Sequence, residues 1–405
     1  MYIHRSIETA VRRLLPQRKV VLVTGARQVG KTTMLRHTMP AEFSYVTLDD
    51  FRALQIAERD PMSFFSVYPL PTVVGEVQHA PSLFRQIKFV VDQSDAKGSI
   101  VLTGSQTYRL MHGVSESLAG RVGVLEMSGL SLRELSGSPK SEGYVPLAFA
   151  DLGQSGKASE GFDLWRHIQR GQMPELQNPD VEWESFYADY VRSYIERDVR
   201  ELINIKDELK FNDFLVACAA RTGQLFNAAD ISSTVGIDSK TVQSWLSVLQ
   251  ASGLVHLIRP LWSNPNKRLS KTPKLFFMDT GLVCYLLGWT NPVAASRGAM
   301  SGHLFETFVA DEILKSYMNA GRDLRNIWFY RDAQKREIDF VVQDGHVLHP
   351  IEVKQSFAPG PEAARHFSAL EAFPDFEVGP GSIVCMTDRP YPVAEGVAAI
   401  SPWDI

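Results

Sequence analysis

The stretch that decides the fold is Lys19-Val20-Val21-Leu22-Val23-Thr24-Gly25-Ala26-Arg27-Gln28-Val29-Gly30-Lys31-Thr32-Thr33. It predicts a buried strand, a glycine-rich turn and the start of a helix, with the spacing Gly-x-x-x-x-Gly-Lys-Thr. In such a turn, backbone N–H groups and the helix N-terminus surround a phosphate. We expect Lys31 to reach the β- and γ-phosphates of ATP and Thr32 to offer its hydroxyl to Mg²⁺. The expected nucleotide-binding residues are Gly25, Ala26, Arg27, Gln28, Val29, Gly30, Lys31, Thr32 and Thr33.

The composition limits what this loop can be attached to. With 405 residues, of which 44% are hydrophobic and 22% charged, the chain suits a globular protein of about two to four units. No apolar run is long enough to span a bilayer, and the first residues lack the apolar core of a signal peptide, so we expect a cytoplasmic protein that does not bind membranes. The three cysteines are far apart, which argues against disulfides and zinc. A net charge of −4 neither requires nor excludes nucleic acid.

Apolar runs recur along the first part of the chain. After an amphipathic helix expected within residues 1–18, with Arg5 on its polar side, they occupy 20–23, 45–48, 72–77 and 99–103. Helix-length segments separate them, which predicts an α/β fold with a parallel sheet covered by helices on both faces. The nucleotide is expected at the carboxyl ends of these strands.

The third apolar run ends in Gly75-Glu76, where a P-loop ATPase carries Asp-Glu. In that pair the aspartate orients Mg²⁺ and the glutamate polarises the attacking water. Glu76 is thus a candidate catalytic residue, with a surface acid as the alternative. Glycine has no side chain for the metal, so Mg²⁺ binding is weakened, rescued by another acid such as Asp49 or Asp50, or lost.

Two more polar positions are candidates for the γ-phosphate. The fourth run is followed by Ser105 and Gln106, either of which would place a side chain between the catalytic water and the γ-phosphate. Arg121 follows a run of small residues and is a candidate arginine finger, acting in trans if the chain forms a ring or dimer. Its alternative role is an ion pair with a surface acid.

These segments together resemble a family of prokaryotic AAA-type ATPases joined to a carboxyl-terminal domain of unknown function. The resemblance rests on the P-loop, the Glu76-Val77-Gln78 segment before Pro81, and residues 102–105 and 117–121. It implies an ATPase core over 1–140 and a helical lid over 162–215, in which Arg197 contacts nucleotide, a neighbouring subunit or a nearby acid. Gly75 departs from the family's Asp-Glu pair. Between core and lid, the small polar residues of 141–161 predict a mobile linker or a long surface loop.

Residues 216–295 predict a winged-helix module. A helix and turn over 227–238 precede a second helix over 239–249, and a strand follows. Lys240, Gln243 or Ser244 would face DNA bases, and the basic segment 266–274 would form the wing. The exposed face nevertheless carries little positive charge, and winged helices also serve as protein-interaction modules. Both interpretations remain open.

Residues 296–405 contain a second set of candidate catalytic residues. Glu306 on a helix, Asp339 on a strand, and Glu352 and Lys354 on the next strand resemble the PD-(D/E)XK nuclease fold. That resemblance implies Asp339 and Glu352 as Mg²⁺ ligands, Glu306 as an auxiliary acid of the metal site, and Lys354 as the catalytic lysine. The fold also includes relatives that do not cleave.

Two functions from different classes fit these patterns. The first is an ATP-dependent machine that acts on nucleic acid through a nuclease-like domain. The second is a switch or scaffold that binds ATP, hydrolyses it poorly, and binds a protein partner while its nuclease-like domain is inactive.

Overall fold

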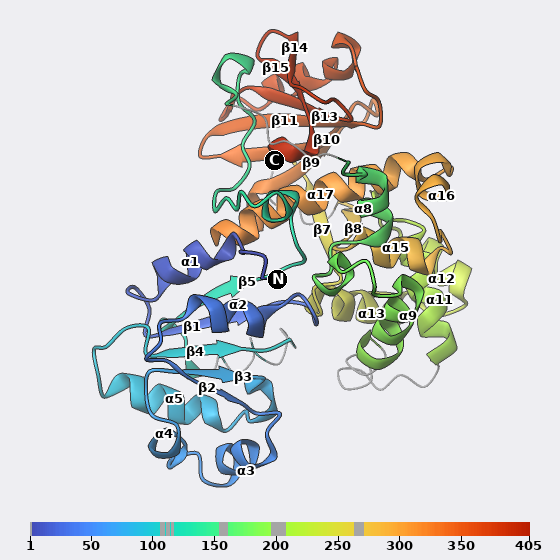
Figure 1. Ribbon diagram of the computed structural model, residues 1–405. Coiled ribbons are helices and arrows are strands. Elements are labelled where there is room, and N and C mark those ends of the chain that lie inside the picture. The colour runs from blue at the N-terminus through green and yellow to red at the C-terminus, as the bar shows by residue number, and fades with distance from the viewer. Residues whose placement is uncertain are drawn as a thin grey trace.

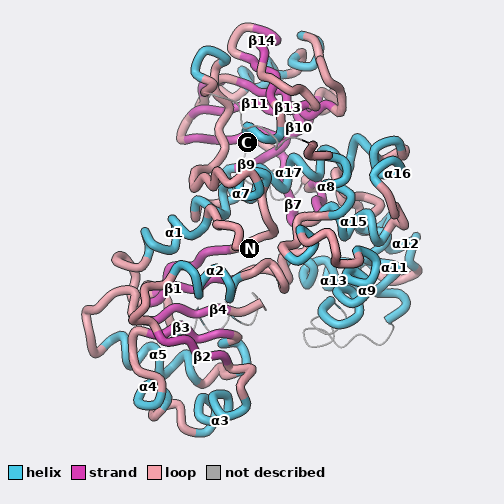
Figure 2. The backbone as a smooth tube through the Cα atoms, in the orientation of Figure 1, coloured by secondary structure: helices cyan, strands magenta, loops and turns pink. Residues whose placement is uncertain are grey.

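The computed structural model describes residues 2–105, 110, 114, 117–153, 161–195, 208–262 and 271–405. Figure 1 shows an N-terminal sheet with its helices, a helical group, and a C-terminal region of strands. The strands gather into two groups, one around β1 to β4 and the other around β9 to β14 (Figure 2). The long helix α17 runs between them.

The N-terminal sheet is parallel, as predicted, with the order β2-β3-β4-β1-β5. Its strands are β1 (Val20–Thr24), β2 (Ser44–Thr47), β3 (Thr72–Gly75), β4 (Ile100–Thr103) and β5 (Val122–Glu126). Strand β5 was not predicted, because only part of it is buried and Gly123 interrupts its apolar pattern. The central strand β1 is fully buried and delivers the chain into the phosphate loop.

Alternate residues of this sheet enter two different cores. Val21, Val23 and Val101 belong to the large core shared with the rest of the chain, whereas Val20 and Leu22 face the helices on the other side. The helices and turns of this part are α1 (Ile7–Leu14), α2 (Lys31–Thr38), α3 (Phe51–Arg59), α4 (Phe64–Val67), η1 (Val77–His79), α5 (Leu83–Asp92) and α7 (Leu132–Leu135). The predicted N-terminal helix is present as α1, and it packs on α17 as well as on α2 and β5.

The helical group combines the predicted lid with the helices that follow it. Its elements are α8 (Leu164–Arg170), η3 (Glu175–Gln177), α9 (Trp183–Asp189), a π-helical turn η4 (Tyr190–Ile195), α11 (Glu208–Ala219), α12 (Ala228–Val235), α13 (Ser239–Ala251), α15 (Thr280–Leu286) and α16 (Pro292–Arg297). Side-chain caps fix several of these starts: Asn227 caps α12, Asp238 caps α13 and Asp279 caps α15. Gly236 ends α12 with a left-handed turn, which produces the predicted helix-turn-helix.

The second sheet continues across the predicted border at residue 295. Its order is β14-β15-β13-β11-β10-β9-β7-β8-β6, with β12 beside β11. The strands are β6 (Gln224–Leu225), β7 (Val255–Pro260), β8 (Lys274–Phe277), β9 (Ile327–Arg331), β10 (Glu337–Asp344), β11 (Val347–Lys354), β12 (Glu377–Val378), β13 (Gly381–Cys385), β14 (Tyr391–Ala394) and β15 (Val397–Ile400). The parallel pair of β7 and β9 links the strands after α13 to those of the carboxyl-terminal region.

Helix α17 (Ser301–Ala320) is almost completely buried between the two sheets. It carries Glu306, Asp311, Glu312 and Lys315 among its buried residues. Nowhere in the described parts of the chain is a helix both long and apolar enough to cross a membrane. The remaining short turns are η2 (Phe149–Asp151), η5 (Leu324–Asn326), η6 (Pro361–Ala364), η7 (Phe367–Ala372) and η8 (Pro402–Asp404).

The start of the predicted linker is a loop that packs along α17. Ser141 Oγ donates to the carbonyl of Asn319 at 3.0 Å, and the Tyr144 amide donates to Ser316 Oγ at 2.9 Å. The Tyr144 hydroxyl reaches Ser382 Oγ at 2.8 Å. These contacts favour the surface loop over the mobile linker for this part of the segment; residues 154–160 lie outside the described chain.

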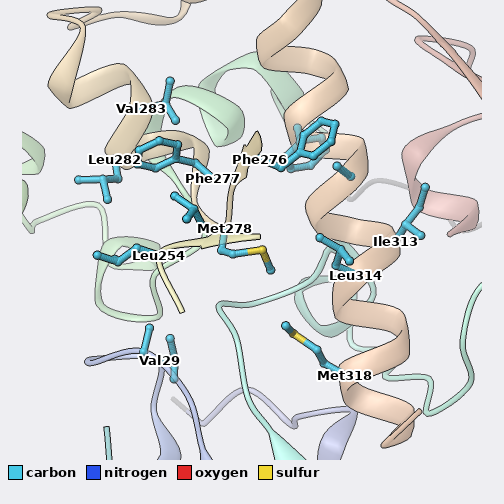
Figure 3. Close-up of a cluster of buried hydrophobic side chains, with 14 of the residues drawn as sticks. Val29, Leu254, Phe276, Phe277, Met278, Leu282, Val283, Ile313, Leu314 and Met318 are labelled. Carbon is cyan, nitrogen blue, oxygen red and sulfur yellow. The ribbon is translucent and has the colours of Figure 1, made fainter. Parts of the chain in front are cut away.

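The two halves of the molecule share one apolar core. Figure 3 shows Val29 of the phosphate loop below Leu254 and Met278, with Leu314 and Met318 of α17 beside them. All five belong to the same cluster of buried side chains. The phosphate loop is therefore built against the rest of the chain rather than on an isolated domain.

Candidate nucleotide site

The phosphate loop adopts the backbone conformation that its glycines predict. Gly25 has φ 144° and Gly30 has φ 92°, both in the region that favours glycine. A Cβ on Gly25 would lie 2.0 Å from the carbonyl oxygen of Met127, so no larger residue fits there. These two positions let the loop turn back over the end of β1.

Lys31 lies inside this loop, with 7% of its surface exposed. Its ammonium donates to the carbonyl oxygens of Gly25 at 2.9 Å and Ala26 at 2.7 Å. Thr32 and Thr33 follow in the first turn of α2, whose N-terminus carries the positive end of the helix dipole. The structure thus gathers the predicted residues 25–33 around one cationic pocket, and their contacts with ATP remain a prediction.

The ends of β3 and β4 bring two further candidates to the same edge of the sheet. Glu76 follows β3 with φ 52°, and its carboxylate accepts a hydrogen bond of 2.6 Å from Gln78 Nε2. Ser105 follows β4, the neighbour of β1, and is 4% exposed. Its hydroxyl has no hydrogen-bond partner in the described structure, an arrangement that costs about 1–3 kcal/mol unless a ligand supplies one. Gln106 lies outside the described residues.

The two acids proposed to replace an aspartate at position 75 differ in their availability. Asp50 accepts from the amides of Arg52 and Ala53, both at 2.9 Å, and so caps α3. Asp49 has 67% of its side chain exposed and lies 3.7 Å from His79 Nε2. Of the two, Asp49 is therefore the acid not engaged in capping.

Arg121 lies at the opposite edge of the sheet. It precedes β5, and its carbonyl accepts from the amide of Val20, the first residue of β1. Its guanidinium pairs with Asp92 at 2.6 Å and 2.9 Å, and this hydrogen bond lowers the pKa of that exposed carboxyl. Arg121 is thus not part of the phosphate site of its own chain, and the ion pair matches the alternative interpretation. Action in trans stays a prediction.

Arg5 holds the phosphate loop in place through hydrogen bonds to backbone carbonyls, a role that was not predicted from the sequence. It was expected on the polar side of the first helix, but it is 4% exposed. Its guanidinium donates to the carbonyl oxygens of Val29 at 2.7 Å, Ser128 at 2.7 Å and Gly129 at 2.9 Å. Nε lies 3.1 Å from Glu134 Oε2, which supplies the compensating charge. That wrong assignment arose because these partners are distant in sequence.

The second candidate site, formed by the predicted nuclease-like residues, contains the ammonium group of a buried lysine, Lys274. Lys274 was expected in the basic wing, but it begins β8 and is 3% exposed. Its ammonium lies 2.8 Å from Glu306, 2.7 Å from Glu337 and 3.8 Å from Asp339. Residues 263–270, the rest of the expected wing, lie outside the described chain.

The remaining nuclease-like residues are close to this cluster. Asp339 Oδ2 accepts from the amide of Val353 at 2.9 Å, and Lys354 donates to Glu352 at 2.6 Å, so these two side chains share a strand face as predicted. Within the described residues, no group of three or more His, Cys, Asp or Glu side chains is arranged to hold a metal ion. The metal roles of Glu306, Asp339 and Glu352 stay a prediction.

The electrostatics of the cluster agree with an internal lysine. Burial disfavours the charge on Lys274, yet the nearby Glu306, Asp339 and Glu337 raise its pKa. Burial also raises the pKa of Asp339 far above its usual value, with the charges of Glu306 and Glu352 adding to the effect. For Glu306, burial opposes ionisation, but the charge of Lys274 holds its pKa below the usual range. Lys274 therefore offsets part of the negative charge that these buried carboxylates would carry.

The sheet and the loop define the class of the N-terminal part. A parallel sheet whose central strand leads into a glycine-rich loop and a helix is the arrangement of a P-loop ATPase. Residues 17–136 match a family model described as "AAA domain". This part of the chain is therefore an AAA-type P-loop ATPase-like domain.

The comparisons supply no activity for the rest. Residues 161–293 match a domain of unknown function, DUF8612, and residues 301–404 match another, DUF4143. Two uncharacterised proteins, from Mycobacterium tuberculosis and Mycobacterium bovis, are each 26% identical over 399 residues, covering 98% of this chain and 83% of theirs.

Solved structures resemble the chain only distantly. The Thermotoga maritima RuvB Holliday junction branch migration motor is 14% identical, with a TM-score of 0.29, covering 62% of this chain and 85% of that one. AMPPCP-bound DnaA from Aquifex aeolicus is 12% identical, with a TM-score of 0.28, covering 60% of this chain and 85% of that one. At these scores the likeness carries no argument about function.

Proposed function

We propose that this chain is an ATP-binding switch whose nucleotide site controls the packing of the helical group and of α17. The observation that carries the proposal is the position of the phosphate loop. Ala26 lies against Gly253 in the turn between α13 and β7, where a Cβ would stand 3.5 Å from the Ala26 amide nitrogen. Val29 lines a small hollow together with Leu254 and Met278. A bound phosphate that reorders this loop would therefore change its contacts with the turn between α13 and β7.

The residues of the loop suit a magnesium nucleotide. Lys31 is poised to exchange two carbonyl partners for phosphate oxygens, and the unpartnered Ser105 hydroxyl offers a donor near the end of β4. Thr32 is the residue that would hold Mg²⁺, which when bound neutralises charge on the phosphates. Glu76 would polarise water if turnover occurs. We propose residues 1–140 as the core that performs these steps.

The experiment is a titration of the full chain with ATP in the presence of Mg²⁺, beside steady-state hydrolysis with and without double-stranded DNA. Lys31→Ala is expected to abolish nucleotide binding, because Lys31 is the residue that the motif directs at the β- and γ-phosphates. Lys19→Ala is the matched control, since that lysine precedes β1 and bonds to Val91 and Ser94 at the other end of the strand. Unchanged ATP affinity in Lys31→Ala would contradict the assignment of residues 25–33 as the ATP site. Tight binding without turnover would support a switch.

A second candidate function is binding to DNA through α12 and α13. The order α11, α12, α13, β7 and β8, with antiparallel pairing of β7, β8 and β6, supports a winged helix. Lys240, Gln243 and Ser244 are exposed on α13, as that role requires. Lys240 is the single cation of this helix, so phosphate contacts are few. Stimulation of ATP hydrolysis by DNA would favour this candidate, and its absence would favour a protein partner.

We further propose that the carboxyl-terminal pocket does not cleave nucleic acid, because Lys274 lies among its carboxylates. Replacing this lysine tests the idea. In Lys274→Met the acids lose their internal cation, so Mn²⁺ is expected to raise the melting temperature of the variant and not of the native chain.

The control for this test is Lys271→Met, three residues earlier and exposed. Mn²⁺-dependent DNA nicking by the native chain that disappears in Asp339→Ala would contradict the proposal.

A further inference from the structure

We propose that Tyr45 takes the place of the missing aspartate at position 75, positioning the Thr32 hydroxyl for the magnesium nucleotide. This inference rests on the proposed ATP site and adds a residue to it. It starts from the space beside Gly75. Strand β2 pairs with β3 so that Tyr45 faces Val73 and Thr47 faces Gly75 across the ladder. Tyr45 therefore lies two residues before the end of β2, and its side chain is long enough to reach the level of Gly75.

The phenol fills the volume that a side chain at position 75 would need. A Cβ built on Gly75 would lie 2.7 Å from Tyr45 Oη and 3.4 Å from Thr47 Oγ1. A carbon atom does not approach a hydroxyl oxygen to 2.7 Å without displacing it. Gly75 and Tyr45 are thus complementary in shape, and the glycine is the residue that leaves room for the phenol.

The same hydroxyl is directed at the phosphate loop. Tyr45 Oη donates to Thr32 Oγ1 at 3.4 Å, a long hydrogen bond that spans from β2 to the first turn of α2. The Arg36 guanidinium, one turn further along α2, lies 4.5 Å from the centre of the tyrosine ring. Two contacts from one helix therefore fix the ring, and the hydroxyl is held beside the threonine that the P-loop motif assigns to the metal.

A phenol and a carboxylate act differently in this position. Both orient a neighbouring hydroxyl, but the neutral phenol adds no negative charge to attract a cation. Asp49 is an acid that follows the end of β2, and its Oδ2 accepts a hydrogen bond of 3.2 Å from Thr47 Oγ1. We infer a site that positions the magnesium nucleotide through Tyr45 and Thr32 without a carboxylate in direct contact.

The inference changes what the simplest variant should do. From the sequence alone, Gly75→Asp is expected to raise hydrolysis. In the structure a side chain at position 75 collides with the Tyr45 phenol, so the single variant Gly75→Asp is expected to bind ATP no more tightly than the native chain. Removing the hydroxyl first makes room, because the next ring atom, Tyr45 Cζ, stands 3.4 Å from the Cβ position. The double variant Tyr45→Phe/Gly75→Asp is therefore the one in which the Cβ at position 75 meets no atom closer than 3.4 Å.

The experiment measures ATP affinity of the full chain over a Mg²⁺ series and in EDTA. Tyr45→Phe is expected to weaken binding about three- to ten-fold with Mg²⁺, the usual size of one hydrogen bond, and to leave the EDTA value unchanged. Adding Gly75→Asp to Tyr45→Phe is expected to restore or exceed native affinity with Mg²⁺. Tyr68→Phe, on the far side of the sheet, is the control.

Two results would overturn the inference. One is Tyr45→Phe with native Mg²⁺ dependence, and the other is Gly75→Asp alone binding as tightly as the double variant. Either failure is distinct from failure of the proposed function, which would appear as native ATP affinity in Lys31→Ala. Thermal unfolding of each variant in EDTA confirms that the sheet is intact.

Discussion

Arg5 illustrates at the residue scale how the nucleotide site depends on groups that never touch nucleotide. Its guanidinium joins the phosphate loop to the exit of β5, and Glu134 balances its charge. Glu134 in turn accepts from the amides of Ser6 at 2.7 Å and Ser131 at 3.0 Å. The pair thus fixes the start of the chain, the loop and α7 in one arrangement.

Removing one partner of this pair should be costly. Arg5→Met leaves Glu134 charged and buried, so we expect a loss of about 3–5 kcal/mol in the free energy of unfolding, measured with urea. The double variant Arg5→Met/Glu134→Gln is expected to lose less, because the orphaned charge is gone. Arg12→Met is the control: Arg12 is exposed, and Glu8 keeps its bonds from the Tyr2 hydroxyl and the Arg5 amide, so the loss should be about 0–1 kcal/mol. Equal losses in the single and double variants would contradict the role of the charge pair.

The sequence predicted the residues of the phosphate site because its motif has fixed spacing. Residues 25–33, Glu76 and Ser105 lie at the carboxyl edge of one parallel sheet, and strand order alone places them there. Lys274 and Tyr45 were missed for a physical reason. Each makes its contacts with residues distant in sequence, and no local pattern encodes such contacts. Arg121 shows the converse, since a motif-like context predicted a role while the fold placed it at the other edge.

At the scale of elements, capping residues and apolar periodicity were reliable guides. Helix α12 lies within the predicted range 227–238 and α13 covers the predicted range 239–249, each begins after a side-chain cap, and the apolar residues Val242, Trp245, Leu246 and Leu249 of α13 are buried. Short or half-exposed strands such as β5 and β6 were not predicted, since pairing partners rather than propensity create them. Helix α8 adds a feature with a measurable consequence, a histidine buried between aromatic rings.

His167 of α8 is expected to make the fold sensitive to acid. It lies 5.4 Å from the Phe162 ring and 5.8 Å from the Phe308 ring, and burial, reinforced by the charge of Lys315, lowers its pKa from 6.5 to about 3. Below pH 6.5 the unfolded chain takes up a proton that the folded chain refuses until about pH 3. Stability from this group is therefore lost as pH falls through that window, by up to about 1.4 kcal/mol per pH unit.

The measurement is urea unfolding between pH 7.5 and 5. His167→Leu should show a shallower decline than the native chain, whereas replacement of the exposed His346 should leave the slope unchanged. Parallel curves for His167→Leu and the native chain would rule out this source of acid sensitivity.

At the scale of the whole molecule, one shared core packs the phosphate loop and the C-terminal region together. Helix α17 contacts the ATPase-like domain through polar bonds as well as apolar packing: Glu312 accepts from the Leu132 amide at 3.0 Å, and Lys315 donates to the Leu130 carbonyl at 2.9 Å. Arg133 closes the same interface by donating to the carbonyl of Ile405 at 2.8 Å. These bonds join the ATPase-like domain to the C-terminal region.

This arrangement predicts that ATP binding changes amide hydrogen exchange in a segment far along the sequence from the phosphate loop. On binding, amide hydrogen exchange should slow in the turn and strand over 250–258, because Gly253 and Leu254 lie against the loop. Helix α5, on the opposite face of the sheet, serves as an internal reference and should not change. Protection confined to residues 25–38 would argue against a switch.

The pairing of β7 with β9 also decides where the chain can be divided. The boundary near residue 295 separates two matched families in sequence, yet a cut there would remove β9 from one side of β7, leave β8 on its other side, and turn β9 into an open edge. Unpaired edges recruit other strands, so each fragment expressed alone should aggregate. Expressed together, the fragments have a native template for one another and should recombine into a complex that purifies as one. We therefore expect the two matched families to form one folding unit in this chain.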